Sequence, residues 1–206
     1  MTVLAWVALI VAAVTAVANW WSRWHLDRRV ELVTKPAVTV AMIVAAAAID
    51  AEPSAATWWF VAGLVLCLAG DVALLPDVDR FVVGLASFLV GHVLFAVGAA
   101  VIGVSWPWVL AAAVVAVAVG GLLGPRIIRA SGELAPAVSA YFAVIMVMAV
   151  LMVGTTRPAG VVGAVAFVVS DSILGWERFV GRIRRAPVLI MVTYHLALCG
   201  LVLTLL

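Results

Sequence analysis

The sequence predicts an all-α fold: a polytopic membrane protein with about eight transmembrane helices, in a single integral membrane domain over residues 1–206. Three observations support this prediction. Of the 206 residues, 67% are hydrophobic and 11% are charged, and the mean hydropathy is +1.30. Such values are typical of an integral membrane protein and not of a soluble domain. Long apolar runs recur along the chain, and tryptophans cluster where these runs end.

Each apolar run is close to the roughly 20 residues that a helix needs to cross the hydrocarbon core. Backbone groups that face lipid must be hydrogen-bonded within their own segment, so the runs are expected to be helices. The expected spans are residues 2–20, 33–49, 57–75, 81–103, 106–124, 137–154, 158–175 and 187–206. Eight of the nine tryptophans lie near span ends, as in an aromatic belt: Trp20, Trp21, Trp24, Trp58, Trp59, Trp106, Trp108 and Trp176.

The basic residues predict the orientation. With both termini on the non-cytoplasmic side, the cytoplasmic loops are residues 21–32, 76–80, 125–136 and 176–186. These loops, together with Lys35, hold eleven of the twelve Lys and Arg residues, and only Arg157 lies on the other side. The positive-inside rule therefore predicts a multi-pass protein of the plasma (inner) membrane with this orientation.

Composition also limits the partners and cofactors. The formal net charge of +2 is too small to indicate nucleic-acid binding. Cys67 and Cys199 both lie in apolar runs, which predicts neither a disulfide framework nor a zinc ribbon. No phosphate-binding or dinucleotide-binding glycine motif is present. The expected partners are membrane lipids, and the oligomeric state is not indicated.

Two carboxylates lie inside the expected spans. Asp71 is five residues before Pro76 and Asp171 is five residues before Trp176, on spans that run in the same direction. At 1.5 Å per residue, each carboxylate lies roughly 7 Å inside the cytoplasmic boundary. An ionisable residue within a span is a candidate functional residue by default, since burying its charge is costly.

The other strongly polar side chains of the spans face the same cytoplasmic half: Lys35, His92, Tyr141, Tyr194 and His195. The outer half has almost none. This asymmetry predicts one polar cavity that opens toward the cytoplasmic leaflet, as an enzyme acting on lipid headgroups needs. A transporter would place polar groups along the whole path or near the midplane.

Structural interpretations stay open for each residue. An intramembrane Asp can pair with a neighbouring helix, His92 can bond a backbone carbonyl, and Lys35 can extend to the interface. Gly120 and Gly124 form a GxxxG pair that predicts a close helix contact. A metal site built from Asp71, His92, Asp171 and His195 is chemically possible, although no His pair has the i, i+4 spacing.

A weak internal repeat has an offset of 100 residues. Asp71 aligns with Asp171, and Lys35-Pro36 aligns with Ala135-Pro136. Each Asp span is followed by a span that contains a His. The repeat suggests two four-helix halves in parallel orientation, related by an axis along the membrane normal.

Six short blocks, in order, resemble the signature of the YhhN-like membrane proteins, the lysoplasmalogenases: "TKP" (34–36), "GDVALL" (70–75), "FVVGLASFLVGH" (81–92), Tyr141, "GAVAFVVSDSIL" (163–174) and "TYHLA" (193–197). The resemblance implies hydrolysis of the vinyl ether of lysoplasmalogens to a fatty aldehyde and glycerophosphoethanolamine or glycerophosphocholine, without a metal or organic cofactor. It carries over Lys35, Asp71, His92, Tyr141, Asp171 and Tyr194 as site residues. The family commonly reads Tyr-Tyr and then Gln in its last block, whereas this chain has Tyr194-His195 and Leu198. Either His195 substitutes for a hydrogen-bonding tyrosine, or the substrate preference differs.

This chemistry suits a pair of aspartates. Vinyl ether hydrolysis begins with protonation of an alkene carbon and continues with addition of water. One carboxylic acid and one carboxylate in different environments are the usual acid and base. We therefore expect Asp71 and Asp171 to be this pair, in either order, and His92 to orient one of them or the water. Lys35 would bind the substrate phosphate, and Tyr141 and Tyr194 would donate hydrogen bonds. A metal-dependent lipid hydrolase of another specificity and a small proton-coupled transporter are the alternatives.

Overall fold

The computed structural model describes all 206 residues and is entirely helical. The helices are α1 (Val3–His25), α2 (Arg28–Ala47), α3 (Ser54–Ala73), α4 (Phe81–Ile102), α5 (Trp106–Ala130), the short 3₁₀ helix η1 (Gly132–Leu134), α6 (Ala135–Gly154), α7 (Pro158–Phe179) and α8 (Ala186–Leu203). The eight α-helices are each long and apolar enough to cross a membrane. The predicted all-α class and the predicted number of spans are confirmed.

The helices continue further at the basic end than the apolar runs indicated. The expected loop 21–32 is mostly helical, because α1 continues to His25 and α2 begins at Arg28. Only a turn remains, with Leu26 in the left-handed region (φ 58°). The side chain of Asp27 caps α2 by accepting hydrogen bonds from two backbone N–H groups of its first turn, at 3.0 and 3.2 Å. The charged residues therefore end the apolar run but not the helix.

The expected loops 125–136 and 176–186 are shortened in the same way, since α5 continues to Ala130 and α7 to Phe179. Pro125 was expected to mark the end of its span, yet it lies inside α5. A membrane helix tolerates such a proline when local adjustments satisfy the freed carbonyl. Proline also stands in the first turn of α5, α6, α7 and α8, where no backbone N–H is needed.

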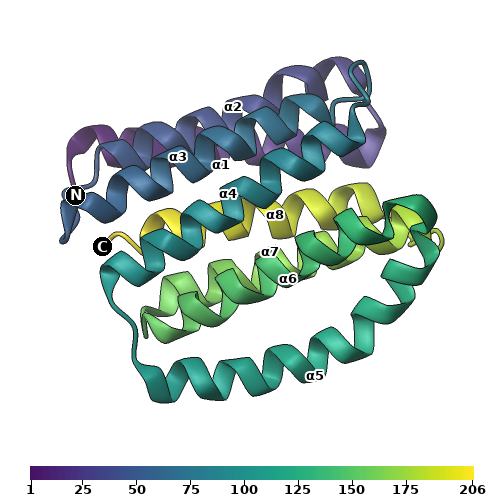
Figure 1. Ribbon diagram of the computed structural model, residues 1–206. Helices are drawn as coiled ribbons and strands as arrows, with labels where there is room; N and C mark the ends of the chain where they lie inside the picture. The colour runs from purple at the N-terminus through teal and green to yellow at the C-terminus, as the bar shows by residue number, and fades with distance from the viewer.

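The bundle is arranged around α8. Helices α1 and α2, α3 and α4, and α7 and α8 pack as neighbouring pairs, and α8 also touches α1, α2 and α3. Figure 1 shows α8 in the middle of the bundle and α5 at its edge. One contact between the halves of the chain occurs twice: α4 packs on α6, and their counterparts α8 and α2 pack on each other. The halves differ at α5, which has no contact with α4, whereas α1 packs on α8.

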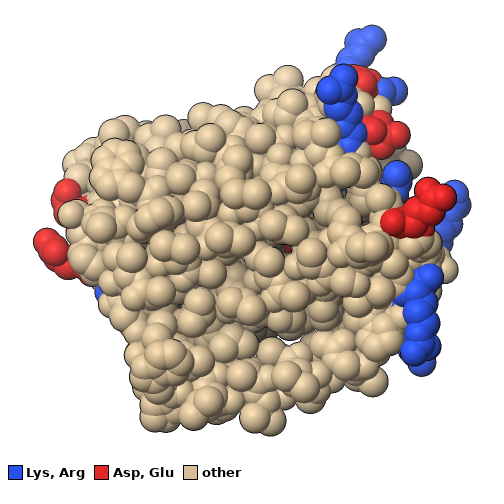
Figure 2. Space-filling view, viewed as in Figure 1, with Lys and Arg blue, Asp and Glu red and all other residues tan.

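Exposed charged side chains gather at the two ends of the bundle (Figure 2). Figure 2 shows Lys and Arg gathered at one end and an uncharged surface between the ends, and the two termini lie at the opposite end (Figure 1). Arg157 is the single basic residue at the terminal end. Its guanidinium donates to the carbonyl oxygens of Thr204 at 2.5 Å and Glu52 at 3.4 Å. Arg157, which directly precedes α7, therefore links the start of this helix to the end of α8 and to the residues before α3.

The backbones of helices α7 and α8 approach each other closely at two glycines. A Cβ built on Gly200 would lie 2.5 Å from Cα of Gly163, and one built on Gly163 would lie 2.7 Å from the backbone nitrogen of Leu201. Backbone atoms cannot move aside as a flexible side chain can. The contact holds α7, which carries Asp171, against the central helix α8.

We expect Gly200→Ala to separate α7 from α8 and to lower the free energy of unfolding by about 1–3 kcal/mol, the usual cost of overpacking. Thermal unfolding of the purified protein in detergent measures the effect. Gly121→Ala is the matched control, because a Cβ at Gly121 would meet no atom within 4 Å. Equal melting temperatures for the two variants would contradict the close contact.

Candidate functional site

Asp71 lies near the end of α3 and is 1% exposed. Its Oδ2 accepts hydrogen bonds from Oγ1 of Thr39 on α2 at 2.5 Å and from the hydroxyl of Tyr194 on α8 at 2.9 Å. Its Oδ1 lies 3.8 Å from Nζ of Lys35 and has no hydrogen-bond partner. Two donors and a cation all stabilise a negative charge, so this environment suits an ionised carboxylate.

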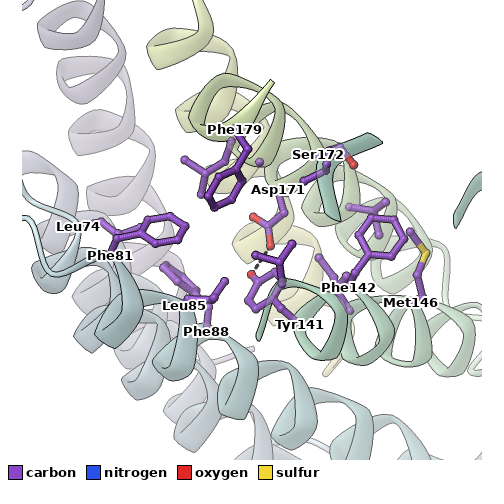
Figure 3. A pocket seen from close by; sticks show the side chains of 16 residues that line it. Leu74, Phe81, Leu85, Phe88, Tyr141, Phe142, Met146, Asp171, Ser172 and Phe179 are labelled. Carbon is purple, nitrogen blue, oxygen red and sulfur yellow. Dashed lines mark hydrogen bonds between the residues drawn. The ribbon is translucent and has the colours of Figure 1, made fainter. Parts of the chain in front are cut away.

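Asp171 has a different environment. It lies eight residues before the end of α7 and is half-buried. The hydroxyl of Tyr141 on α6 donates a hydrogen bond to its Oδ2, as Figure 3 shows. No Lys or Arg forms an ion pair with it, in contrast to Asp71. The two carboxylates therefore differ in their partners in the way that an acid and a base would require.

Both aspartates line one pocket at the basic end, which we call the polar pocket. Its volume is about 810 Å³, and its charged lining residues are Arg23, Glu31, Lys35, Asp71, Asp79, Asp171 and Arg178. Tyr194 also lines it. The structure thus brings Lys35, Asp71, Asp171 and Tyr194 of the expected site residues together in one pocket at this end of the bundle.

A second pocket adjoins the first, and we call it the apolar pocket. It encloses about 620 Å³, and 13 of its 16 lining residues are hydrophobic. Asp171 is its single charged residue, and Tyr141 lies beside it (Figure 3). Asp171, Leu74, Phe81, Phe88 and Leu174 line both pockets. Asp171 consequently lies where a charged pocket meets an apolar one.

His92 lies in the aromatic wall behind the pockets and lines neither of them. Its Nδ1 bonds the carbonyl oxygen of Phe88 at 2.6 Å, and its ring packs edge-on against Phe167 and Tyr141, with centroids 4.4 and 5.5 Å away. It hydrogen-bonds neither aspartate. The backbone bond matches the structural interpretation of His92. Its fully buried Nε2, however, has no partner, and its contact with Tyr141 connects it to Asp171.

His195 also lies outside both pockets, although its neighbour Tyr194 lines the polar pocket. The indole N–H of Trp20 on α1 donates to its Nδ1 at 2.9 Å, and its Nε2 is buried without a partner. Since Nδ1 accepts this bond, the ring is neutral with its proton on Nε2. His195 thus connects α8 to α1, and no bond joins it to Asp71 or Asp171.

Several residues of the polar pocket were not singled out by the sequence analysis. Glu31 and Arg23 fall in the expected cytoplasmic loop 21–32, yet they form an ion pair, and Glu31 is 6% exposed. Thr39 was not considered at all. Their spacing does indicate a shared position: Glu31, Lys35 and Thr39 are four residues apart and so lie on one face of α2. The apolar run that was used to define the span began too late to include Glu31.

The structure brings together no group of three or more His, Cys, Asp or Glu side chains that could hold a metal ion. The four residues considered for such a site are divided instead: Asp71 and Asp171 line the polar pocket, whereas His92 and His195 lie behind it, on α4 and α8.

The predicted contact at Gly120 and Gly124 involves a side chain. A Cβ at these positions would lie 3.4 and 3.3 Å from the ring of Phe142 on α6. The two glycines therefore accommodate an aromatic ring that also lines the apolar pocket, and α5 approaches α6 closely at this end of the bundle.

The family comparison covers most of the chain. The model of the YhhN family matches residues 30–205, which include every site residue described above except Arg23. No curated protein and no solved structure matches the chain significantly. The matched region contains the aspartates of α3 and α7, the lysine of α2 and the tyrosines of α6 and α8 that surround the two pockets. The chain belongs to the YhhN family.

Proposed function

We propose that this protein is a lysoplasmalogenase, which hydrolyses the sn-1 vinyl ether of a lysoplasmalogen to a fatty aldehyde and a glycerophosphoethanolamine or glycerophosphocholine. One observation carries the proposal: Asp171 lies between a charged pocket and an apolar pocket, and Asp71 lines the charged one. A lysolipid has this same division, because its vinyl ether joins a polar headgroup to a hydrocarbon chain. Membership of the YhhN family supports the proposal.

The partners of the two aspartates suggest their roles. Asp71 has a cation at 3.8 Å and two hydroxyl donors, so we assign it as the ionised base. Asp171 has one hydroxyl donor and no ion pair, so we assign it as the protonated acid. A carboxylic acid without a compensating cation keeps its proton in a low-dielectric site.

The reaction then proceeds in three balanced steps. Asp171 gives its proton to the alkene carbon remote from the ether oxygen, and the double-bond electrons form the new C–H bond and leave an oxocarbenium ion. Water adds to the cationic carbon as it loses a proton to the unpartnered Oδ1 of Asp71. In the last step the hemiacetal hydroxyl returns a proton to Asp171, the bond to the glycerol oxygen breaks, and that oxygen takes the proton from Asp71. Both aspartates regain their starting states.

The other site residues would orient these groups and the substrate. Tyr141 and Tyr194 hold the two carboxylates by hydrogen bonds, and His92 packs against Tyr141 and so would orient Asp171 through it. His195 has no bond to either aspartate, so we assign it to the packing of α8 on α1. The hydrocarbon chain would occupy the apolar pocket.

Two cations are candidates for the phosphate of the headgroup. Lys35 is 5% exposed, and its charge faces Asp71. Arg178 is exposed at the mouth of the polar pocket, forms no ion pair and lies over the ring of Phe81 at 4.8 Å. We therefore propose that Arg178 meets the phosphate first and that Lys35 completes the site. Because it also neutralises Asp71, Lys35 serves both binding and chemistry.

Asp71→Asn and Asp171→Asn should each lower aldehyde release by about 10³-fold or more, since each removes a proton carrier. Release from a lysoplasmalogen by detergent-purified protein, with EDTA present, measures this. Asp77→Asn is the matched control, because Asp77 pairs with Arg28 at the same end of the bundle but outside both pockets. Thermal unfolding shows that each variant is folded.

Full activity in a folded Asp71→Asn or Asp171→Asn variant would contradict the acid–base pair. Loss of activity in the wild type on addition of EDTA would favour a metal-dependent hydrolase. No aldehyde from any lysoplasmalogen with well-folded wild type would leave a hydrolase of another specificity or a small proton-coupled transporter as the better explanation.

Arg178→Ala should raise KM about tenfold and leave kcat nearly unchanged, because an exposed phosphate contact contributes equally to ground-state and transition-state binding. Lys35→Ala should lower kcat as well, because it leaves Asp71 buried without its cation. Steady-state kinetics with lysoplasmenylethanolamine separate the two roles. Arg182→Ala, at the same end but outside the polar pocket, is the control. Identical kinetic changes in the Arg178 and Lys35 variants would contradict the division.

We also propose that the basic end of the bundle faces the cytoplasm, which places both termini outside the plasma (inner) membrane and the site in the cytoplasmic half. Eleven of twelve Lys and Arg residues support this orientation. A C-terminal alkaline phosphatase fusion should be active and a C-terminal green fluorescent protein fusion dark. The reverse pattern would invert the orientation.

A further inference from the structure

The structure contains a third hollow, which the site does not include. It lies between α5, α6 and α7, is open on one side, and all 13 of its lining residues are hydrophobic. Six of them belong to α5, from Trp108 to Val119. We call it the α5 groove. Helix α5 stands apart from the bundle at this level (Figure 1), and the space-filling surface is hollowed beside it (Figure 2).

The α5 groove adjoins the apolar pocket. Met146 of α6 and Val168 of α7 line both, and both side chains are half-buried. A methionine is flexible and adapts to different neighbours. Figure 3 shows Met146 at the edge of the apolar pocket, beyond Phe142 as seen from Asp171. Met146 and Val168 therefore lie between the two spaces, and an apolar path from Asp171 to the lipid-facing side of the bundle would pass these two side chains.

The direction and length of this path fit one hydrocarbon chain. Helix α6 lines it from Tyr141, beside Asp171, to Val153, near the terminal end of the bundle. Twelve residues of helix rise about 18 Å. One lipid tail spans about half of the roughly 30 Å hydrocarbon core. The path starts at the charged end and runs away from it, as the chain of a lipid does from its headgroup.

The ends of α5 explain the shape of the groove. At the basic end, Gly120 and Gly124 let α5 approach α6 through the ring of Phe142. Toward the terminal end, α5 has no contact with α4. It is held away from α6 and α7 over the lining residues Ala112, Val115 and Ala116. The groove is thus closed where the headgroup would lie and open to lipid along its length.

We propose that the α5 groove binds the distal part of the substrate's alkenyl chain and so sets the chain-length preference of the enzyme. The assignment rests on the proposed function, because it names the chain of that same lipid. Neither the headgroup nor a soluble ligand suits the groove, since no polar residue lines it. A chain long enough to pass Met146 gains contacts in the groove that a short chain does not reach.

The first test requires no turnover. The probe is a saturated alkyl lysophosphoethanolamine, which lacks the reactive double bond, with a photoreactive diazirine at the end of its chain. The wild type in nanodiscs is irradiated, and the labelled peptides are identified by mass spectrometry. Label should concentrate on α5 and α6 at the groove, and excess unlabelled alkyl lysolipid should reduce it about tenfold or more. Label spread evenly over the lipid-facing helices, or unaffected by the competitor, would overturn the proposal.

The second test is kinetic. Ala112→Trp should fill the groove and lower kcat/KM for a long alkenyl chain by about tenfold relative to a chain too short to pass Met146. Ala118→Trp is the matched control, because Ala118 is exposed on the same helix outside the groove. An equal effect on both chain lengths, or the same selectivity in the control, would contradict the proposal. If the wild type hydrolyses no lysoplasmalogen, the proposed function fails, while the labelling pattern still tests the groove.

Discussion

The buried ion pair between Lys35 and Asp71 is the constraint on which the rest of the site depends. Both side chains are nearly inaccessible, at 5% and 1% exposure, in the apolar interior of a membrane protein. Removing one partner of such a pair costs about 3–5 kcal/mol, because it leaves an uncompensated charge. The pair is sustained by hydroxyl donors from α2 and α8. Three helices must therefore meet at one carboxylate, and this requirement places the central helix α8.

The two halves of the chain are similar in helix packing but differ in the charged and polar groups around their aspartates. Asp71 and Asp171 have corresponding places in the internal repeat, and α4 on α6 repeats the packing of α8 on α2. Lys35, however, corresponds to Ala135, so the second half supplies no lysine to its aspartate. Asp171 is left with Tyr141 as its partner. The absence of a lysine counterpart, together with tyrosines that have no counterpart in the other repeat (Tyr194 opposite Leu94, Tyr141 opposite Ala41), gives the two carboxylates unlike environments in one cavity.

The same comparison explains the apolar side of the site. Helix α1 packs on α8, but its counterpart α5 has no contact with α4. Helix α5 packs on α6 near the pocket, where its Ile127 lines the wall, but further along it leaves the apolar groove between α5, α6 and α7. The charged pocket is enclosed by the first half of the chain together with α7 and α8, and the apolar pocket opens toward α5. This difference between the two halves of the chain gives the site one polar side and one apolar side.

Hydrophobicity along the chain determined the all-α class, the eight spans and the segregation of basic residues, because a bilayer imposes these on any sequence that crosses it. It also indicated Asp71, Asp171, Lys35 and Tyr194 as candidates, since a polar group in a span is rare enough to be noticed. Helix ends were misjudged near Glu31 and Pro125. Charge ends an apolar run, but helical hydrogen bonds continue beyond it.

Only the tertiary structure decided which of these residues meet. Rotation of each helix about its axis is not visible in an apolar run, since lipid-facing and core-facing positions are both hydrophobic there. For this reason the sequence does not indicate that Thr39 faces the polar pocket, or that His92 and His195 lie outside it. The pairing of Lys35 with Asp71 rather than Asp171, the neutral His195 held by Trp20, and the displacement of α5 all depend on contacts between segments far apart in the chain. The sequence by itself determined what the membrane requires of the protein, and packing between helices decided its chemistry.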